Sequence, residues 1–244
     1  LSSIPQLMII IILLSGSILF RKLTKKKIFF KDLSSLEKLS RVSAICTDKV
    51  GAFSKNRMEI VKAYDSNGLI DIDEEVSKES MGKSLYRMLN IGILCNDIRT
   101  VKTNVENSKE NLVELALVRF GQQNGIYKGE LEEANNRIFQ ILFDSERRIM
   151  TTVNKMSKKY RANVKGAPDS IIARCTHIFK NGVEVEITDE DIKAIKDWNI
   201  NMSGECLYVV GFAYRNFNYE PSVKENIESN LVFVGLIGFD NMLK

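Results

Sequence analysis

The chain has 244 residues, a formal net charge of +4 and a single histidine, His177. Its apolar and charged fractions are those of an ordinary globular protein, and its four cysteines are widely spaced without a C-x-x-C pair. These counts argue against a disulfide framework and against a zinc site. Five cations between Arg21 and Lys27 account for the positive excess. We therefore expect no basic face of the kind that binds nucleic acid.

The first expected element is a helix over Ile4 to Phe20, a run that contains no charged residue. Its length is at the lower limit for a membrane-spanning helix, and the alternative is a helix buried in a core. The basic cluster after the run favours the membrane, because such a flank lies on the cytoplasmic side. We expect residues 1–21 to be a membrane helix in contact with lipid and the region after residue 21 to be cytoplasmic. Because Leu1 is not an initiator methionine, we expect a piece of a longer protein.

Beyond the basic cluster, helical and strand periodicities alternate along the chain. A strand is expected over Ser43 to Thr47, and helices are expected over 81–95 and 111–125. Strands should flank a polar turn within 137–155, and 160–171 should form a strand, a turn and a helix start. A helix capped by Thr188 and two strands, 207–215 and 231–239, complete the pattern. The pattern predicts a mixed α and β protein.

The stretch I-C-T-D-K-V-G-A-F-S-K-N, Ile45 to Asn56, places Asp48 after a β-rich run. A carboxylate can accept a phosphoryl group and so divide a difficult transfer into two easier steps. Lys49 would meet the charge that develops during transfer, and Gly51 would let the backbone approach the phosphate closely. The alternative is that Asp48 caps a helix.

This stretch resembles the D-K-T-G-T-[LI]-T signature of the P-type cation-pump ATPases, with Asp48, Lys49 and Gly51 matching. Other segments resemble the same family in the same order. They are I-P-Q-L, E-N-L-V-E-L-A-L, F-D-S-E-R-R-I-M-T-T-V, V-K-G-A-P-D-S-I-I-A-R-C-T-H-I and L-Y-V-V-G-F-A-Y-R. The chain is most similar to the calcium-pump-like branch.

The resemblance implies an α/β fold in four parts. Residues 1–21 would be the end of a membrane helix, and residues 22–58 the stalk and the first part of a Rossmann-like phosphorylation domain of the haloacid-dehalogenase type. Residues 59–230 would form an inserted α+β nucleotide-binding domain with an antiparallel sheet. Residues 231–244 would return into the phosphorylation domain.

The resemblance also implies ATP and Mg²⁺ as cofactors and a transported cation, Ca²⁺ or another. Asp48 would receive the phosphate beside Lys49 and Gly51, and Mg²⁺ would bind Asp48 and the backbone carbonyl of Val50. The ion pathway would include Pro5 and Gln6. The implied nucleotide-binding residues are Glu114, Phe143, Arg148, Lys165 and Gly166. Without the resemblance, Phe143 would be assigned to a core, and Glu114 and Arg148 to a solvated surface.

Several positions depart from the family pattern. Val50 and Ala52 replace threonines of the signature, Tyr208 stands where the family has an arginine that reaches the nucleotide phosphates, and Gln6 replaces a cation-binding glutamate. A lost donor to the transferred phosphate typically costs about 10²–10³ in rate. We therefore expect that Asp48 does not turn over in this chain by itself. The alternatives are a membrane-anchored nucleotide-binding pseudoenzyme or scaffold and, third, a soluble haloacid-dehalogenase-type phosphatase.

Overall fold

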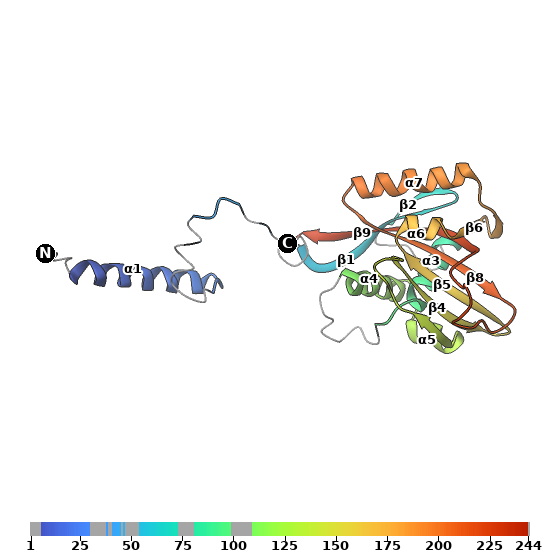
Figure 1. The fold of residues 1–244 in the computed structure, drawn as a ribbon, viewed down its shortest axis with the longest axis horizontal. Coiled ribbons are helices and arrows are strands. Elements are labelled where there is room, and N and C mark those ends of the chain that lie inside the picture. Colours follow the sequence, from blue (N-terminus) through green and yellow to red (C-terminus); the bar gives the residue numbers. More distant parts are fainter. Residues whose placement is uncertain are drawn as a thin grey trace. The chain divides into compact units, whose positions relative to one another are not determined.

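The computed structural model describes residues 6–29, 38, 41–44, 46, 54–72, 81–98 and 109–243. The chain divides into two compact units, Leu1–Thr47 and Asp48–Lys244. Helix α1 (Gln6–Lys25) belongs to the first unit, and the second unit is a sheet covered by helices (Figure 1).

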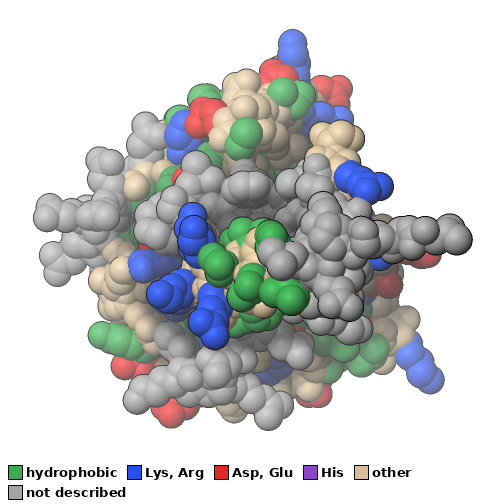
Figure 2. Space-filling model, turned by 90° about the vertical axis from the view of Figure 1, so that its left-hand side faces the viewer, with side chains coloured by type: hydrophobic (Ala, Val, Ile, Leu, Met, Phe, Trp, Pro, Cys, Tyr) green, Lys and Arg blue, Asp and Glu red, His purple; other side chains and the backbone are tan. Residues whose placement is uncertain are grey.

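Helix α1 confirms the helix expected near the start of the chain but not a membrane span. No helix in the described ranges is long and apolar enough to cross a membrane. Apolar side chains of α1 such as Ile10 and Leu14 are exposed, and Figure 2 views a face where hydrophobic side chains lie among Lys and Arg.

The second unit is built on one sheet, to which the described residues contribute nine strands. Its main path runs β2-β1-β9-β8-β5-β4-β3, and each pairing along that path is antiparallel. At its side, β6 (Cys175–Lys180) lies parallel to β9 and pairs with β7 (Val183–Glu186). The strands of the main path are β1 (Ser54–Asp65), β2 (Gly68–Asp71), β3 (Arg137–Ile141), β4 (Ile149–Met156), β5 (Lys159–Gly166), β8 (Tyr208–Phe217) and β9 (Leu231–Leu243).

Helices cover both faces of this sheet (Figure 1). One face carries α3 (Lys83–Leu94) and α4 (Lys109–Gln123), with α5 (Lys128–Ala134) packed against them. The other face carries α6 (Pro168–Ile172) and α7 (Asp189–Gly204). The predicted cap of α7 is confirmed: Thr188 Oγ1 accepts from the Asp191 N–H (3.3 Å), and Asp191 Oδ2 accepts from the Thr188 N–H (3.1 Å).

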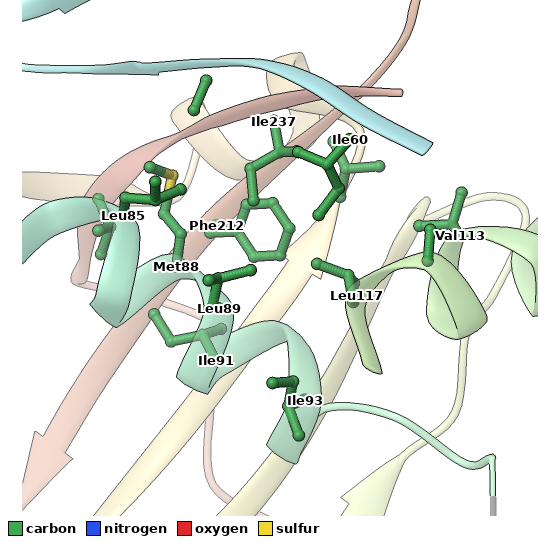
Figure 3. Packing of buried hydrophobic residues seen from close by; sticks show 14 of the residues in the cluster. Ile60, Leu85, Met88, Leu89, Ile91, Ile93, Val113, Leu117, Phe212 and Ile237 are labelled. Atoms are coloured by element: carbon green, nitrogen blue, oxygen red, sulfur yellow. The ribbon is translucent and has the colours of Figure 1, made fainter. Parts of the chain in front are cut away.

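Strands β8 and β9 are buried on both faces, which explains their nearly continuous apolar sequences. Phe212 points toward α3 and α4, whereas its neighbour Ala213 faces the side of α6 and α7. In Figure 3 the fully buried ring of Phe212 lies among Leu89 of α3, Leu117 of α4 and Ile237 of β9. This core fixes α4 against the centre of the sheet.

Two expectations for the phosphorylation domain are not met in the described part of the chain. Val42 to Ala44 and Cys46, within or beside the strand expected over Ser43 to Thr47, are not in a strand, and no parallel Rossmann-like sheet appears there. Strand β9 has antiparallel partners along both edges, β1 and β8. The first residues of β9 also pair in parallel with β6, so the hydrogen-bonding groups of β9 are used within this one sheet.

Candidate functional site

A pocket of about 150 Å³ opens beside the ends of β5 and β8, and we call it the aromatic pocket. Its lining comes from four segments of the chain: helix α4, residues 143–150, the β5–α6 junction and the start of β8. The five positions at which the sequence predicts nucleotide binding are all part of this lining. The lining residues are Val113, Glu114, Phe143, Arg148, Met150, Lys165, Gly166, Ala167, Pro168, Tyr208, Val209 and Val210.

A buried ion pair between two of these residues joins α4 to β5. Lys165 is 8% exposed and Glu114 7% exposed, and Lys165 Nζ lies 2.6 Å from Glu114 Oε1. A buried charge needs a partner of opposite sign and hydrogen bonds to its remaining atoms. Each residue supplies the other with that partner. The interpretation of Glu114 as a solvated surface residue is therefore wrong.

The loop after α3 holds the second oxygen of the Glu114 carboxylate. The backbone N–H of Asp97 donates to Glu114 Oε2 (3.0 Å), and Asn96 Nδ2 donates to the Glu114 carbonyl (2.9 Å). Asn96 Oδ1 in turn accepts from the Ile98 N–H (2.9 Å). Both carboxylate oxygens of Glu114 thus have defined partners.

The side chains of Lys128 and Arg137 hold this loop in place. We call these two side chains, together with residues Leu94 to Ile98, the loop clasp. Lys128 Nζ donates to the carbonyls of Ile98 (2.5 Å) and Asn96 (3.0 Å). Arg137 Nη2 donates to the carbonyls of Leu94 (2.9 Å) and Asn96 (2.7 Å). Burial lowers the pKa of Lys128 below its usual 10.5. The clasp borders a polar hollow of about 660 Å³, lined by Asn96, Asp97, Lys128, Glu132, Arg137 and Gln140.

The turn between β3 and β4 carries one side of the pocket rim. Asp144 Oδ1 accepts from the N–H groups of Glu146 and Arg147, both at 2.9 Å. These bonds, the one from Arg147 first, hold the pKa of Asp144 below its usual 3.8. The N–H of Arg148 donates to the Asp144 carbonyl (2.6 Å), and Arg148 has the left-handed φ of 58°. The backbone next to Phe143 is therefore fixed by local hydrogen bonds.

The rim exposes two aromatic side chains. Phe143 in this turn is 45% exposed, and Tyr208 at the start of β8 is 43% exposed. The interpretation of Phe143 as a core residue is therefore wrong. Arg148, also on the rim, is exposed to solvent.

Gly166 lets β5 approach β4 at the pocket. A Cβ at this position would lie 2.3 Å from the Arg148 carbonyl oxygen and 2.7 Å from the Ile149 Cα. The next residue adds a hydrogen bond to this contact, because the Ala167 N–H donates to the same Arg148 carbonyl (2.9 Å). A larger residue at 166 would displace the backbone that carries Arg148.

The sequence did not identify the apolar part of the lining, to which Val113, Met150 and Val210 belong. Val210 follows Tyr208 by two residues, so strand alternation places both on one face of β8 and could have indicated it. Beneath Met150 lies Cys95, whose thiol is fully buried with Sγ 3.4 Å from the Met150 carbonyl. Burial raises the pKa of Cys95 to about 11, which keeps the thiol protonated and unreactive.

The predicted phosphorylation and ion-pathway residues cannot be placed in the same way. Asp48, Lys49, Val50 and Gly51 lie outside the described residues, as does Pro5, and Gln6 is described only as the first residue of α1. Within the ranges that the structure describes, no group of three or more His, Cys, Asp or Glu side chains is placed to hold a metal ion. Binding of Mg²⁺ at Asp48 and Val50 thus stays a prediction.

A comparison with known protein families finds a match to the part of the chain that contains the aromatic pocket. Residues 84–244, which include the entire pocket, match the family described as P-type ATPase, cytoplasmic domain N. This chain belongs to the P-type ATPases. The family resemblance inferred from the motifs around Asp48 and Lys165 is confirmed.

Individual P-type ATPases match nearly the whole chain. Calcium-transporting ATPase 1 of Bacillus cereus is 31% identical over 97% of the chain, and a calcium-transporting ATPase of Listeria monocytogenes is 29% identical over 96%. The human sodium/potassium-transporting ATPase subunit alpha-4 is 24% identical over 97%. The chain spans about a quarter of the length of these relatives, covering 26%, 26% and 25% of them.

Proposed function

We propose that this chain is the nucleotide-binding segment of a cation-transporting P-type ATPase and that the aromatic pocket binds ATP. The observation that carries the proposal is the convergence of Glu114, Phe143, Arg148, Lys165 and Gly166, from separate elements, on one pocket. The match to the cytoplasmic domain N of the family supports it.

Each of these side chains offers a different contact to ATP. The exposed ring of Phe143 offers a flat face for stacking on the base. The ammonium of Lys165 has three donors, of which one points at Glu114, so further donors remain for a ligand. Arg148 on the rim offers a cation for phosphate oxygens. Gly166 keeps the backbone of the rim in place.

The test is titration calorimetry of ATP into the full chain and two variants. Phe143→Ala should weaken ATP binding by about 5- to 150-fold, the range that corresponds to 1–3 kcal/mol for a lost base–aromatic contact. Leu142→Ala is the matched control, because Leu142 is the exposed neighbour of Phe143 outside the pocket lining. An equal loss in both variants, or no binding of ATP to the natural chain at millimolar concentration, would contradict the proposal.

In the whole protein, Asp48 would accept the γ-phosphate with Mg²⁺ bound at Asp48 and Val50, and the cycle would move a cation, Ca²⁺ or another, along a path that includes Pro5 and Gln6. The names of the bacterial relatives support calcium as the first candidate. The chain by itself would not turn over, because Ala52 and Tyr208 lack groups that stabilise the phosphates. Acid-quenched labelling with γ-labelled ATP, compared with Asp48→Asn, tests this. A hydroxylamine-sensitive label that disappears in the variant would show that the loop accepts phosphate unaided.

The second candidate is a nucleotide-binding pseudoenzyme that senses ATP without hydrolysing it. The specific observation in its favour is that Tyr208, the departure from the family arginine, lines the pocket itself. The two candidates differ in the whole protein, where a pump would release phosphate from ATP and a pseudoenzyme would not.

A further inference from the structure

The rim of the aromatic pocket offers aromatic surface from two separate elements. Phe143 comes from the β3–β4 turn and Tyr208 from the first position of β8, and nearly half of each side chain is exposed. Tyr208 shares its strand face with Val210, which also lines the pocket. Exposed aromatic faces beside an apolar wall suit a planar heterocycle, because every nucleobase has a face on which an aromatic ring can stack.

The charges of the same pocket suit a polyphosphate poorly. Lys165 lies against Glu114 at 2.6 Å, so this pair brings no net charge to the lining. Arg148 is the other cation among the lining residues. The neighbouring Arg147 is turned to Glu228, with Nη1 2.7 Å from both carboxylate oxygens. The lining thus has a formal net charge of +1, against several negative charges on a triphosphate.

An anion also lies close to Arg148 along the turn. The carboxylate of Asp144 is held ionised by two backbone N–H groups, and the Asp144 carbonyl accepts from the N–H of Arg148. The turn that offers the cation of Arg148 to a phosphate group therefore also carries a negatively charged carboxylate. Ion pairs at such exposed positions change affinity by no more than about fivefold, and salt screens them further.

We propose that the pocket recognises the nucleoside part of its ligand through Phe143 and Tyr208 and discriminates little among adenosine, AMP, ADP and ATP. This inference rests on the proposed function, namely that the aromatic pocket is the nucleotide site. Tyr208 is then the residue that determines specificity: its ring adds affinity for the base or ribose, and its lack of charge removes a preference for phosphates.

The test is titration calorimetry of the full chain with adenosine, AMP, ADP and ATP in turn, in Mg²⁺-free buffer. The four dissociation constants should lie within about tenfold of one another, because one exposed cation adds about fivefold at most. Tyr208→Ala should weaken all four ligands by a similar factor, roughly 5- to 150-fold for a lost aromatic contact. Tyr208→Phe should keep the affinities, and Tyr208→Arg should raise the ratio of ATP to adenosine affinity. Tyr127→Ala, an exposed tyrosine outside the pocket lining, is the matched control.

Three results would count against this inference. A preference of the natural chain for ATP over adenosine of a hundredfold or more would overturn it while leaving the proposed function intact. Adenosine affinity unchanged by Tyr208→Ala, in a variant with an unaltered circular dichroism spectrum, would overturn the role of Tyr208. Failure of all four ligands to bind the natural chain would overturn the proposed function, and this inference with it.

Discussion

The aromatic pocket and the polar hollow beside the loop clasp both contain a lysine and an arginine but use them differently. In the hollow, Lys128 and Arg137 donate to backbone carbonyls of the loop after α3. In the pocket, Lys165 is paired with Glu114 while Arg148 is exposed beside two aromatic rings. The hollow is the larger of the two, at about 660 Å³ against 150 Å³. The cations of the hollow therefore bind the fold's own backbone, whereas those of the pocket lie against a carboxylate or are exposed.

Glu114 connects the two regions, because one of its oxygens meets Lys165 in the pocket and the other meets the loop held by the clasp. This arrangement separates two kinds of effect. Changes in the clasp should lower the free energy of unfolding, and changes on the rim should lower the affinity for ATP.

The largest loss of unfolding free energy is expected when the ion pair between Glu114 and Lys165 is broken. Glu114→Ala leaves Lys165 buried without its carboxylate, and breaking a buried pair in this way costs about 3–5 kcal/mol. Urea denaturation followed by circular dichroism measures the loss. The double variant Glu114→Ala/Lys165→Met should recover part of it, since no charge is then buried. A loss below about 1 kcal/mol in the single variant would mean that the pair is solvated in solution.

The next prediction tests whether the loop clasp affects stability more than it affects ATP binding. Arg137→Ala removes a cation that donates to the carbonyls of Leu94 and Asn96, and a hydrogen bond to a charged group is worth about 1.5–3 kcal/mol. We expect a loss of unfolding free energy in this range and a smaller loss of ATP affinity than in Phe143→Ala. Lys158→Ala, in the exposed β4–β5 turn, is the control. If Arg137→Ala abolished ATP binding without changing stability, the distinction between clasp and pocket would fail.

The third prediction tests the close backbone contact at Gly166, beneath the pocket rim. Gly166→Ala forces a Cβ against the Arg148 carbonyl and Ile149 Cα, and overpacking of this kind costs about 1–3 kcal/mol. Weaker ATP binding should accompany the lower denaturation midpoint, because Arg148 and Phe143 belong to the displaced turn. Gly129→Ala is the matched control, since a Cβ there meets no atom within 4 Å. Equal results for the two variants would show that β4 and β5 separate easily.

The smallest effect concerns the pH dependence of the rim. The folded pKa of Asp144 lies below 3.8, so its hydrogen bonds are present above that value and are lost as the pH falls through the folded pKa. Amide resonances of Glu146 and Arg147 should therefore titrate with a midpoint below 3.8. Asp144→Asn should abolish this titration. A midpoint at or above the usual value would indicate that the turn is open in solution.

The sequence predicted α3, β8 and β9 from their strong apolar patterns and α7 from its capping residues Thr188 and Asp191. It did not identify β1, because a register shift between Ile60 and Lys62 interrupts the two-residue alternation on which a strand prediction depends. In β6 the register shifts between Cys175 and His177, with the same consequence. Irregular strands of this kind depend on neighbours that are distant in sequence, which a local pattern cannot reveal.

The site was predicted as a set of residues but not as an arrangement. Motif resemblance identified Glu114 and Lys165 separately, but their ion pair joins residues 51 positions apart. Nothing in the sequence around Lys128 or Arg137 indicated that their side chains hold a loop. These contacts follow from how α4 packs on the sheet and α5 packs on α3 and α4, so they could be recognised only in three dimensions.

The position of β9 in the sheet also affects how the protein forms during synthesis. Strand β9 comes after every other described element in the chain, yet it joins β1 on one side to β8 on the other. Until β9 leaves the ribosome, β2 is the one described strand that pairs with β1, and an isolated two-stranded hairpin is marginally stable. During that interval the apolar residues Met58 and Ile60 can pack on α4, but the edge of β1 that later pairs with β9 stays open, and unpaired strands are prone to aggregate. Closing the sheet is therefore a late folding step, and a nascent chain arrested before β9 should depend on chaperones.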